Sequence, residues 1–320
     1  MGAASLGLLG IWSPCQLASQ RSLNPSSMAL FAGARSWRKN CQSQILTTCR
    51  TRAALASTCG LGPAYDGVTA LLLLQKDFMT DERSPGGSKI LKHQHQPGGL
   101  LVAEGDEAAH ARVEEVFTRH FGPVQNVFHE IVSSRVHIDV HCIAPNPLAN
   151  HYTLFTTGMS DLPMKEVDGT LGVQHAELSI RLPASWPLTQ EAFADEANYW
   201  PIRWLKTLAR FPHDYATWLG DGHTIPNGNP PKPFASSTAL CGWLIHPFYQ
   251  FMAEARLAIN DTKAVGLYEI MPIYSEEMTF KLEKGATALM DKLDAMKIDY
   301  QVLDPKRRNA CGRTKLFGVF

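Results

Sequence analysis

Residues 136–143 read VHIDVHCI, and this stretch decides the fold class. Apolar and polar side chains alternate from Val136 to Cys142, and Ile143 adds a second apolar residue at the end. One face would carry Val136, Ile138, Val140 and Cys142, and the other would carry His137, Asp139 and His141. A period of two is the period of a β-strand, and an apolar row on one face is typical of a strand that covers a core. The stretch therefore predicts a sheet with a buried side.

Further strands and helices are predicted on both sides of this stretch. The apolar runs that favour strands lie at residues 124–132, 152–157, 176–182, 240–246 and 265–273. Helical spacing of apolar residues, together with capping residues, predicts helices at about 106–121, 189–197, 200–211 and 275–296. Strands and helices do not alternate regularly, so a doubly wound parallel sheet is not required. We expect a single α+β domain, an α/β sandwich whose mixed or mainly antiparallel sheet is covered by helices.

Composition divides the chain of 320 residues into four segments. They are a leader (1–78), a flexible arm rich in glycine, proline and histidine (79–103), the globular domain (104–300) and a basic tail (301–320). We expect the tail to be loose from Asp304 onward. Residues 1–59 contain no aspartate or glutamate but carry six arginines and lysines. Met79 offers a later start, so we expect a leader that is disordered or absent from the mature protein. The alternative is a mitochondrial presequence, of which this composition is typical.

The composition excludes several classes of function. Lysine plus arginine and aspartate plus glutamate number 30 each, so the chain lacks the bulk positive charge that grips nucleic acid. No apolar run approaches the ~18 residues that a membrane span needs. The seven cysteines show no disulfide framework, which favours a reducing compartment. We expect a cytoplasmic protein, or a mitochondrial one if the leader is a true presequence, that binds neither nucleic acid nor membrane and needs no cofactor.

The polar face of residues 136–143 is the main candidate for metal chemistry. His137, Asp139 and His141 would line up on one face of the strand, and metal sites use this set of donor groups. One alternative is a metal-dependent enzyme that uses this face, with His223 as a further candidate, and the other is a solvated polar face. No nucleophile elbow, P-loop, dinucleotide fingerprint or paired-cysteine motif accompanies these residues. We therefore expect a protein that is not an enzyme.

A long loop rich in glycine and proline is predicted at residues 212–239. Its length favours function or mobility over a role in the scaffold. The loop contains Trp218, Ile225 and Phe234. These side chains either stand exposed to bind a protein or peptide or are tucked into the core, and the sequence leaves both alternatives open.

Several phrases together resemble the suppressor-of-fused domain, and most closely its short, single-domain bacterial members. They are YTLFTTGMSDLPM (152–164), AELSIRL (176–182), YWPIRWLKTLARF (199–211), WLGDGHTIPN (218–227) and VGLYEIMPIYSEEMTFKLEKGATAL (265–289). The resemblance covers about residues 104–296. It implies a non-enzymatic α/β domain that sequesters or neutralises a protein partner. Animal members hold Gli-type transcription factors in the cytoplasm, and the bacterial members resemble immunity proteins that neutralise a toxin.

The resemblance also implies which residues face the partner. Asp161 in GMSD and Glu177 in AELS match positions at which the animal proteins present carboxylates to their ligand, and both would suit a basic partner surface. The candidate partner-binding residues also include Ser160, Trp218, Asp221 and His223. Because Glu177 would lie on the polar face of its strand, reversing Asp161 and Glu177 to lysine is expected to weaken binding and leave thermal stability almost unchanged. The alternative is that Asp161 caps its own turn and Glu177 is merely solvated.

Overall fold

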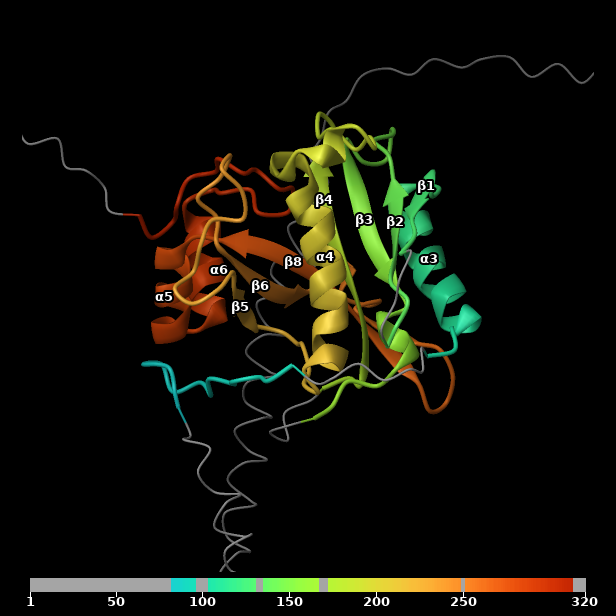
Figure 1. Ribbon diagram of the computed structural model, residues 1–320, viewed down its shortest axis with the longest axis horizontal. Coiled ribbons are helices and arrows are strands. Elements are labelled where there is room, and N and C mark those ends of the chain that lie inside the picture. The colour runs from blue at the N-terminus through green and yellow to red at the C-terminus, as the bar shows by residue number, and fades with distance from the viewer. Residues whose placement is uncertain (1–81, 96–102, 131–134, 167–171, 249–250, 313–320) are drawn as a thin grey trace, which may run out of the picture. The chain divides into compact units, whose positions relative to one another are not determined.

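One sheet runs through the part of the chain that the computed structural model describes, which is residues 82–95, 103–130, 135–166, 172–248 and 251–312 (Figure 1). The predicted leader at residues 1–78 lies outside the described residues. The strands are β1 (Asn126–Phe128), β2 (Asp139–Ile143), β3 (His151–Thr157), β4 (His175–Pro183), β5 (Thr224–Pro226), β6 (Gly242–Pro247), β7 (Arg256–Ala258) and β8 (Ala264–Ile273).

The strand order is β1-β2-β3-β4-β8-β6-β5, with β7 paired to β8. The pairing of β4 with β8 is parallel, and the other pairings are antiparallel. All residues of β4 between its two ends are buried. A strand that is buried on both faces requires cover on both sides of the sheet.

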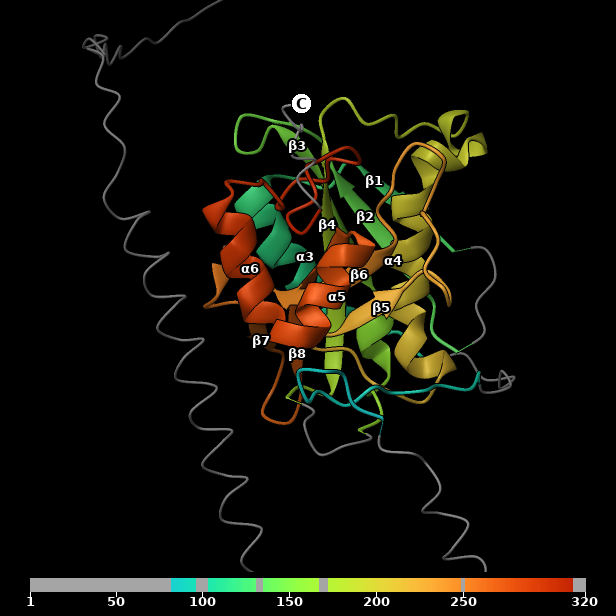
Figure 2. The same ribbon diagram turned by 90° about the vertical axis from the view of Figure 1, so that its left-hand side faces the viewer.

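Helices supply this cover (Figure 2). The described helices are α3 (Glu107–Phe121), α4 (Glu196–Asp214), α5 (Ser275–Lys284) and α6 (Ala286–Ala295). On α4, Leu205 and Leu208 share one apolar cluster with Leu178 of β4. On α3, the ring of Phe117 stacks on Phe155 of β3 with 4.2 Å between the centroids. None of the helices in the described ranges is both long enough and apolar enough to cross a membrane.

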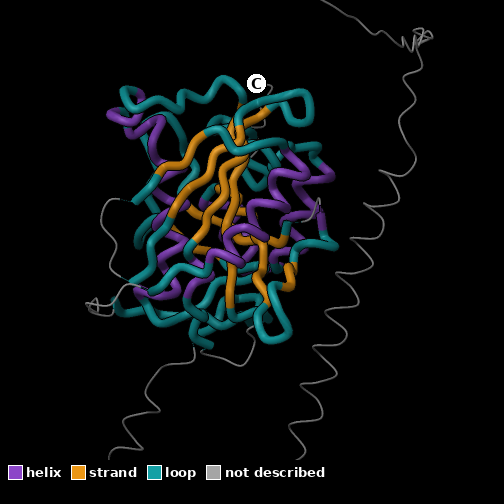
Figure 3. Tube along the Cα trace, turned by 90° about the vertical axis from the view of Figure 1, so that its right-hand side faces the viewer, coloured by secondary structure: helices purple, strands orange, loops and turns teal. Residues whose placement is uncertain are grey.

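Alternation along β8 shows how the helices divide the two faces. Ile270 belongs to the cluster under α4, whereas Leu267 belongs to the cluster under α3, and Met271 and Ile273 belong to the cluster under α5 and α6. Successive side chains of a strand point to opposite faces, so α3, α5 and α6 share one face and α4 covers the other. Figure 3 shows helices on either side of the twisted strands. The predicted class, an α+β sandwich around a mixed and mainly antiparallel sheet, is confirmed.

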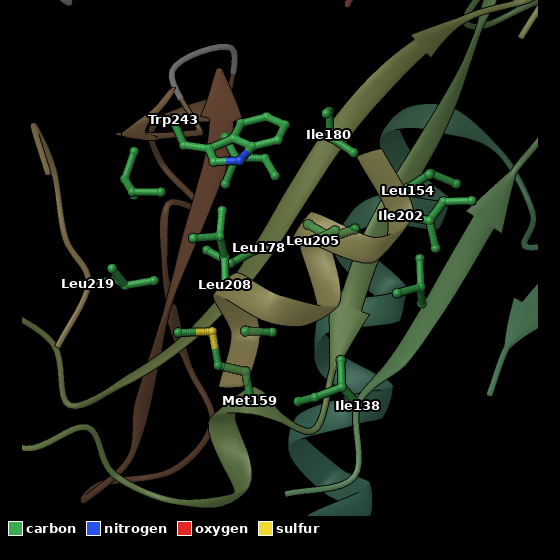
Figure 4. Close-up of a cluster of buried hydrophobic side chains, with 14 of the residues drawn as sticks. Ile138, Leu154, Met159, Leu178, Ile180, Ile202, Leu205, Leu208, Leu219 and Trp243 are labelled. Atoms are coloured by element: carbon green, nitrogen blue, oxygen red, sulfur yellow. The ribbon is translucent and has the colours of Figure 1, made fainter. Parts of the chain in front are cut away.

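The alternating burial is confirmed for residues 136–142, and Ile143, which follows Cys142, is buried as well. Val136, Ile138 and Val140 are fully buried, and Cys142 is nearly so. Figure 4 shows Ile138 in the apolar cluster that α4 covers. The hydrogen-bonded strand is shorter than predicted and begins at Asp139, because its partner β3 ends at the opposite residue, Thr157.

The final helix is divided, although the apolar spacing predicts one long helix from Ser275. Gly285 ends α5 and precedes α6, with φ 90° and ψ 162°. This backbone conformation is almost restricted to glycine. Apolar residues on both sides of the break, such as Leu282 and Leu289, keep a seven-residue offset that fits an unbroken helix equally well.

The two helical segments predicted at 189–197 and 200–211 have other boundaries in the structure. The first is a short 3-10 turn, Ala192–Ala194, and the second is part of the continuous helix α4. The carboxylate of Asp195 accepts the backbone N–H of Ala197 at 2.9 Å and so caps α4 earlier than predicted. Pro201 consequently lies inside the helix and not in its first turn.

Both flanking segments contact the domain where the structure describes them. Arg307 is 7% exposed and forms a buried ion pair with Glu277 of α5, so the expectation of a loose chain from Asp304 is wrong for residues 304–312. In residues 82–95, the backbone N–H of Gly86 donates to the carbonyl of Leu282 in α5 at 2.9 Å. Further along this segment, the ring of His93 packs edge-on against Phe211 of α4.

Candidate functional site

A tight turn after β3 positions the predicted site residues Ser160 and Asp161. Gly158 has φ 100°, and a Cβ at this position would lie 1.8 Å from the carbonyl oxygen of His137. The position therefore requires glycine. The chain turns here into the short 3-10 helix η1 (Met159–Asp161), which contacts the first residues of β4.

Glu177 of β4 is buried, which corrects the expectation that it lies on a solvated face. Its exposed fraction is 1%. One carboxylate oxygen accepts a hydrogen bond from the Thr156 hydroxyl at 2.6 Å, and the other accepts the backbone N–H of Ser160 at 2.9 Å. The face of the sheet that carries Glu177 is also covered by the protein, so a carboxylate on it must form its hydrogen bonds with protein groups.

Asp161 is also withdrawn from solvent, with a side chain that is 3% exposed. Its Oδ1 accepts the backbone N–H of Asp106 at 3.0 Å and lies 2.8 Å from Nε2 of His110. Asp106 is the N-cap of α3, where its carboxylate accepts the N–H of Ala109 and binds the ammonium of Lys263 at 2.7 Å. Asp161 therefore anchors the beginning of α3 to the end of β3.

Three histidines from distant segments surround η1. His110 of α3 contacts Asp161, Nδ1 of His175 lies 2.8 Å from the carbonyl of Ser160, and Nε2 of His213 lies 2.9 Å from the carbonyl of Met159. Each residue of η1 is thus bonded to a different imidazole. Sequence reasoning missed His110 and His175, because no local pattern marks contacts between residues that are 51 and 15 positions apart. We call these three histidines together with Ser160, Asp161 and Glu177 the η1 site.

Burial and pairing set the protonation of the η1 site. Burial raises the pKa of Glu177, although hydrogen bonds to its carboxylate oppose this effect. Burial lowers the pKa of both His175 and His213. The hydrogen bond to Asp161 raises the pKa of His110 and outweighs the lowering by burial. The hydrogen bond to Asp161 therefore favours the charged form of His110, whereas burial disfavours the charged forms of His175, His213 and Glu177.

Ser160 has a buried hydroxyl that is not set up as a nucleophile. The residue is fully buried, and its Oγ has no hydrogen-bond partner among the described residues. A serine nucleophile needs a base within hydrogen-bond reach. The geometry of the η1 site is that of a buried polar network that holds α3, β3 and β4 together.

Protein stability is expected to respond to pH through His110. Its pKa in the folded protein is raised above the ordinary value of 6.5. The interaction with Asp161 is therefore fully present below about pH 6.5 and is lost as the pH rises through the folded-state pKa. His110→Gln keeps a hydrogen-bond donor but removes the titrating charge. The substitution should lower the free energy of unfolding by about 1 kcal/mol more at pH 6 than at pH 9, as measured by urea unfolding.

His95→Gln provides the matched control for this experiment, because that imidazole is exposed in the arm. It shows how the loss of a histidine outside the η1 site affects the free energy of unfolding at the two pH values. An effect of His110→Gln that does not change between pH 6 and pH 9 would contradict a charged pair with Asp161.

The other predicted partner-binding residues lie between α4 and the short strand β5, in the segment predicted as one long loop. Trp218 and Phe234 are 7% and 4% exposed and belong to the cluster under α4, so these aromatic side chains are tucked into the core. The centroids of the His223 and Trp218 rings are 4.1 Å apart. The backbone carbonyl of His223 accepts the N–H of Ile245 in β6. Asp221 is exposed. The structure thus places the predicted residues in two groups, of which only the second reaches the surface directly.

The predicted metal ligands are only partly brought together. His137 and Asp139 are close, with 3.1 Å between Nε2 and Oδ1. His141 points elsewhere, and its Nε2 lies 2.9 Å from the hydroxyl of Thr157. His223 contacts β6, which is separated from β2 by β3, β4 and β8 in the sheet. The metal enzyme predicted from His137, Asp139, His141 and His223 therefore lacks an assembled site.

Comparison with solved structures gives relatives of low sequence identity. A chain described as a SUFU homolog from Neisseria gonorrhoeae is 19% identical with a TM-score of 0.47, and the match covers 65% of this chain and 97% of that one. A chain of the Sufu–Fu complex is 13% identical with a TM-score of 0.44 and coverage of 66% and 93%. Drosophila Suppressor of Fused is 14% identical with a TM-score of 0.45, and the match covers 65% of this chain and 52% of that one. A search of curated proteins gave no match.

The comparison with protein families gives a direct match. The model for the suppressor of fused protein (SUFU) matches residues 134–308, which is more than half of the chain. The matched range contains β2 to β8, α4 to α6 and both carboxylates of the η1 site, whereas α3 with His110 precedes it. The chain belongs to the suppressor-of-fused family.

Proposed function

We propose that this chain is a non-enzymatic protein-binding module that sequesters or neutralises a protein partner. The observation that carries the proposal is the family match, because it spans nearly all of the described sheet and three of its covering helices. The arrangement around Ser160 supports it, since the hydroxyl makes no hydrogen bond to a base among the described residues, as nucleophilic catalysis would require.

The partner that we propose is a toxin or a regulatory protein in the cytoplasm, in keeping with the resemblance to bacterial immunity proteins. The balanced charge favours a protein partner over nucleic acid. Fusion of residues 1–78 to a fluorescent reporter tests the location. A diffuse cytosolic signal supports the cytoplasm, and a mitochondrial signal supports the presequence interpretation and contradicts this part of the proposal.

Within the predicted partner-binding set, we assign direct contact to the residues that a partner can reach. Asp221 is exposed, and His223 is partly exposed beside it. Asp161 can be approached through His110, whose side chain is 29% exposed, so an incoming basic group would compete with that imidazole. Glu177 is buried and holds η1 in place through the Ser160 N–H. Charge complementarity of this kind mainly sets specificity and the rate of encounter.

Affinity capture with the tagged full chain as bait tests the proposal. Native lysate is passed over the wild type and over a variant that carries Asp161→Asn and Asp221→Asn. The amide at position 161 keeps the acceptor that α3 uses, so the fold should survive while the charge is removed. We expect a protein recovered in stoichiometric amount with the wild type, and an affinity at least about tenfold weaker for the variant, a loss of about 1.4 kcal/mol.

The matched control for capture is Asp291→Asn, which removes an exposed carboxylate on α6. It should recover the partner as the wild type does. Failure to recover any stoichiometric protein would contradict the binding function itself. Recovery that is unaffected by the double variant would leave the binding function in place but remove Asp161 and Asp221 from the interface.

A further inference from the structure

The register of β1 and β2 brings an unpredicted histidine to the polar face of β2. Phe128 of β1 is paired with Val140 of β2, so the next residue along, His129, comes to lie opposite Asp139. Residues opposite each other on antiparallel strands have Cβ atoms about 4.5–5.5 Å apart. His137 lies two residues before Asp139 and therefore points to the same side. Three groups that can ligate a metal thus converge from two segments of the chain.

The distances within this group, which we call the β1–β2 histidine cluster (His129, His137 and Asp139), are short. Nδ1 of His129 lies 3.0 Å from Oδ1 of Asp139, and Nε2 of His137 lies 3.1 Å from the same oxygen. One donor atom from each residue lies within 4.8 Å of the other two. Tetrahedral Zn²⁺ with bonds of 2.0–2.2 Å holds its ligand atoms about 3.3–3.5 Å apart, so small side-chain rotations would bring all three atoms to a common centre.

The shared oxygen is not occupied by hydrogen bonding. Oδ1 of Asp139 is buried and has no hydrogen-bond partner among the described residues, although both imidazole nitrogens are close to it. A buried carboxylate oxygen normally has a partner. The two imidazole nitrogens lie about as far from this oxygen as two ligand atoms of one metal ion lie from each other, but without hydrogen-bond geometry. A cation bound between the three atoms would satisfy the oxygen.

The exposure of the cluster permits a metal to enter and the ligands to adjust. The side chains of His129 and His137 are 69% and 45% exposed, whereas that of Asp139 is 22% exposed and held by its strand. Two neutral imidazoles and a carboxylate suit borderline cations such as Zn²⁺, and Mg²⁺ or Ca²⁺ prefer all-oxygen sites. We propose that His129, His137 and Asp139 bind a divalent transition metal of the Zn²⁺ type, with water completing the coordination.

The surroundings limit the strength of this site. The ammonium of Lys206 on α4 donates to the carbonyl of His129 at 3.2 Å, and this positive charge lies close enough to interact with Asp139. A neighbouring cation lowers the affinity for a second one. We therefore expect a moderate affinity for the metal, so that occupancy of the site follows the concentration of available metal.

A bound metal would strengthen the attachment of β1 to β2. β1 is a three-residue edge strand, and so short a strand is weakly held by its own ladder. A metal would join the end of β1 to the beginning of β2 through side chains. The site thus acts as a removable clamp on one edge of the sheet, separate from the η1 site.

Titration with Co²⁺, a spectroscopic substitute for Zn²⁺, tests the proposal on the full chain after treatment with chelator. We expect saturable visible absorption bands that Zn²⁺ abolishes by competition. His129→Ala, His137→Ala and Asp139→Asn should each weaken the binding at least about tenfold. Because His129 is 69% exposed, its replacement should leave the fold intact, which circular dichroism can verify.

His141→Ala is the matched control, since His141 lies on the same face of β2 but outside the cluster. It should bind Co²⁺ as the wild type does. The proposal is overturned if no saturable Co²⁺ signal is found, if His129→Ala leaves the affinity unchanged, or if His141→Ala weakens it equally. Ligation by the cysteines would show itself separately as an intense thiolate charge-transfer band and would survive all three cluster variants.

Discussion

Replacing Arg307 by alanine is expected to lower the free energy of unfolding by about 3 to 5 kcal/mol. The two terminal nitrogens of its guanidinium bind the two carboxylate oxygens of Glu277 at 2.7 and 2.5 Å, and the side chains are 5% and 0% exposed. Glu277 also accepts the backbone N–H groups of Tyr274 and Ala310. The substitution leaves a buried carboxylate without its counter-ion. Urea unfolding of the full chain, followed by circular dichroism, measures the loss.

Arg308→Ala is the matched control, because this neighbouring arginine is exposed and donates to the carbonyl of Met296. Its expected loss is about 1 kcal/mol or less. Adding Glu277→Gln to Arg307→Ala should restore part of the stability, since a neutral amide is less unfavourable in the interior than an unpaired carboxylate. If Arg307→Ala were no more harmful than Arg308→Ala, the ion pair would not hold residues 304–312 to the domain.

Glu177→Lys should lower the free energy of unfolding by more than about 3 kcal/mol. This replaces the expectation, drawn from alternation alone, that reversal of this charge leaves stability almost unchanged. The residue is 1% exposed, and its two oxygens accept hydrogen bonds from Thr156 and Ser160. A lysine accepts no hydrogen bond, so both donors would lose their partner while an ammonium is buried beside His110. Thermal and urea unfolding measure the effect.

Glu177→Gln is the informative companion to the lysine variant. Burial raises the pKa of Glu177 above its ordinary value of 4.5. As the pH rises through 4.5, the unfolded chain ionises while the folded chain retains its proton, so the wild type loses stability relative to the amide until the folded-state pKa is passed. The stability of Glu177→Gln relative to wild type should therefore be greater at pH 7 than at pH 4.5. A difference that does not change with pH would contradict the raised pKa.

The parts of the fold that depend on neighbours in sequence were predictable. The alternation of residues 136–142 and the acidic start of α3 at Asp106 are local, and the structure has both. Gly285 was missed because a single glycine is tolerated in a helical pattern, and only its φ of 90° shows the break. The parallel pairing of β4 with β8 was not predicted, because no local pattern records which strands will be neighbours.

The candidate sites were less predictable, since burial of a polar residue is decided by segments that arrive from elsewhere. Glu177 alternates with apolar neighbours as a solvated residue would, and its burial depends on η1 and α3. Asp161 meets His110 across 51 positions. The β1–β2 histidine cluster needs the strand register, which replaces the predicted ligand His141 with His129. The chemistry of each side chain could be stated from the sequence, but the residues that surround it in the folded protein could not.

The parallel pairing of β4 with β8 also has a consequence for the synthesis of the protein. Arg181 in β4 is buried against Glu269 in β8, 88 positions later. At a translation rate of about 5–20 residues per second, β8 leaves the ribosome about 4 to 18 s after β4. During that interval the central strand of the finished sheet is an unpaired edge with a charge awaiting its partner, and such edges attract other chains. Between the emergence of Arg181 and that of Glu269, β4 is therefore an edge strand that is open to pairing with other chains.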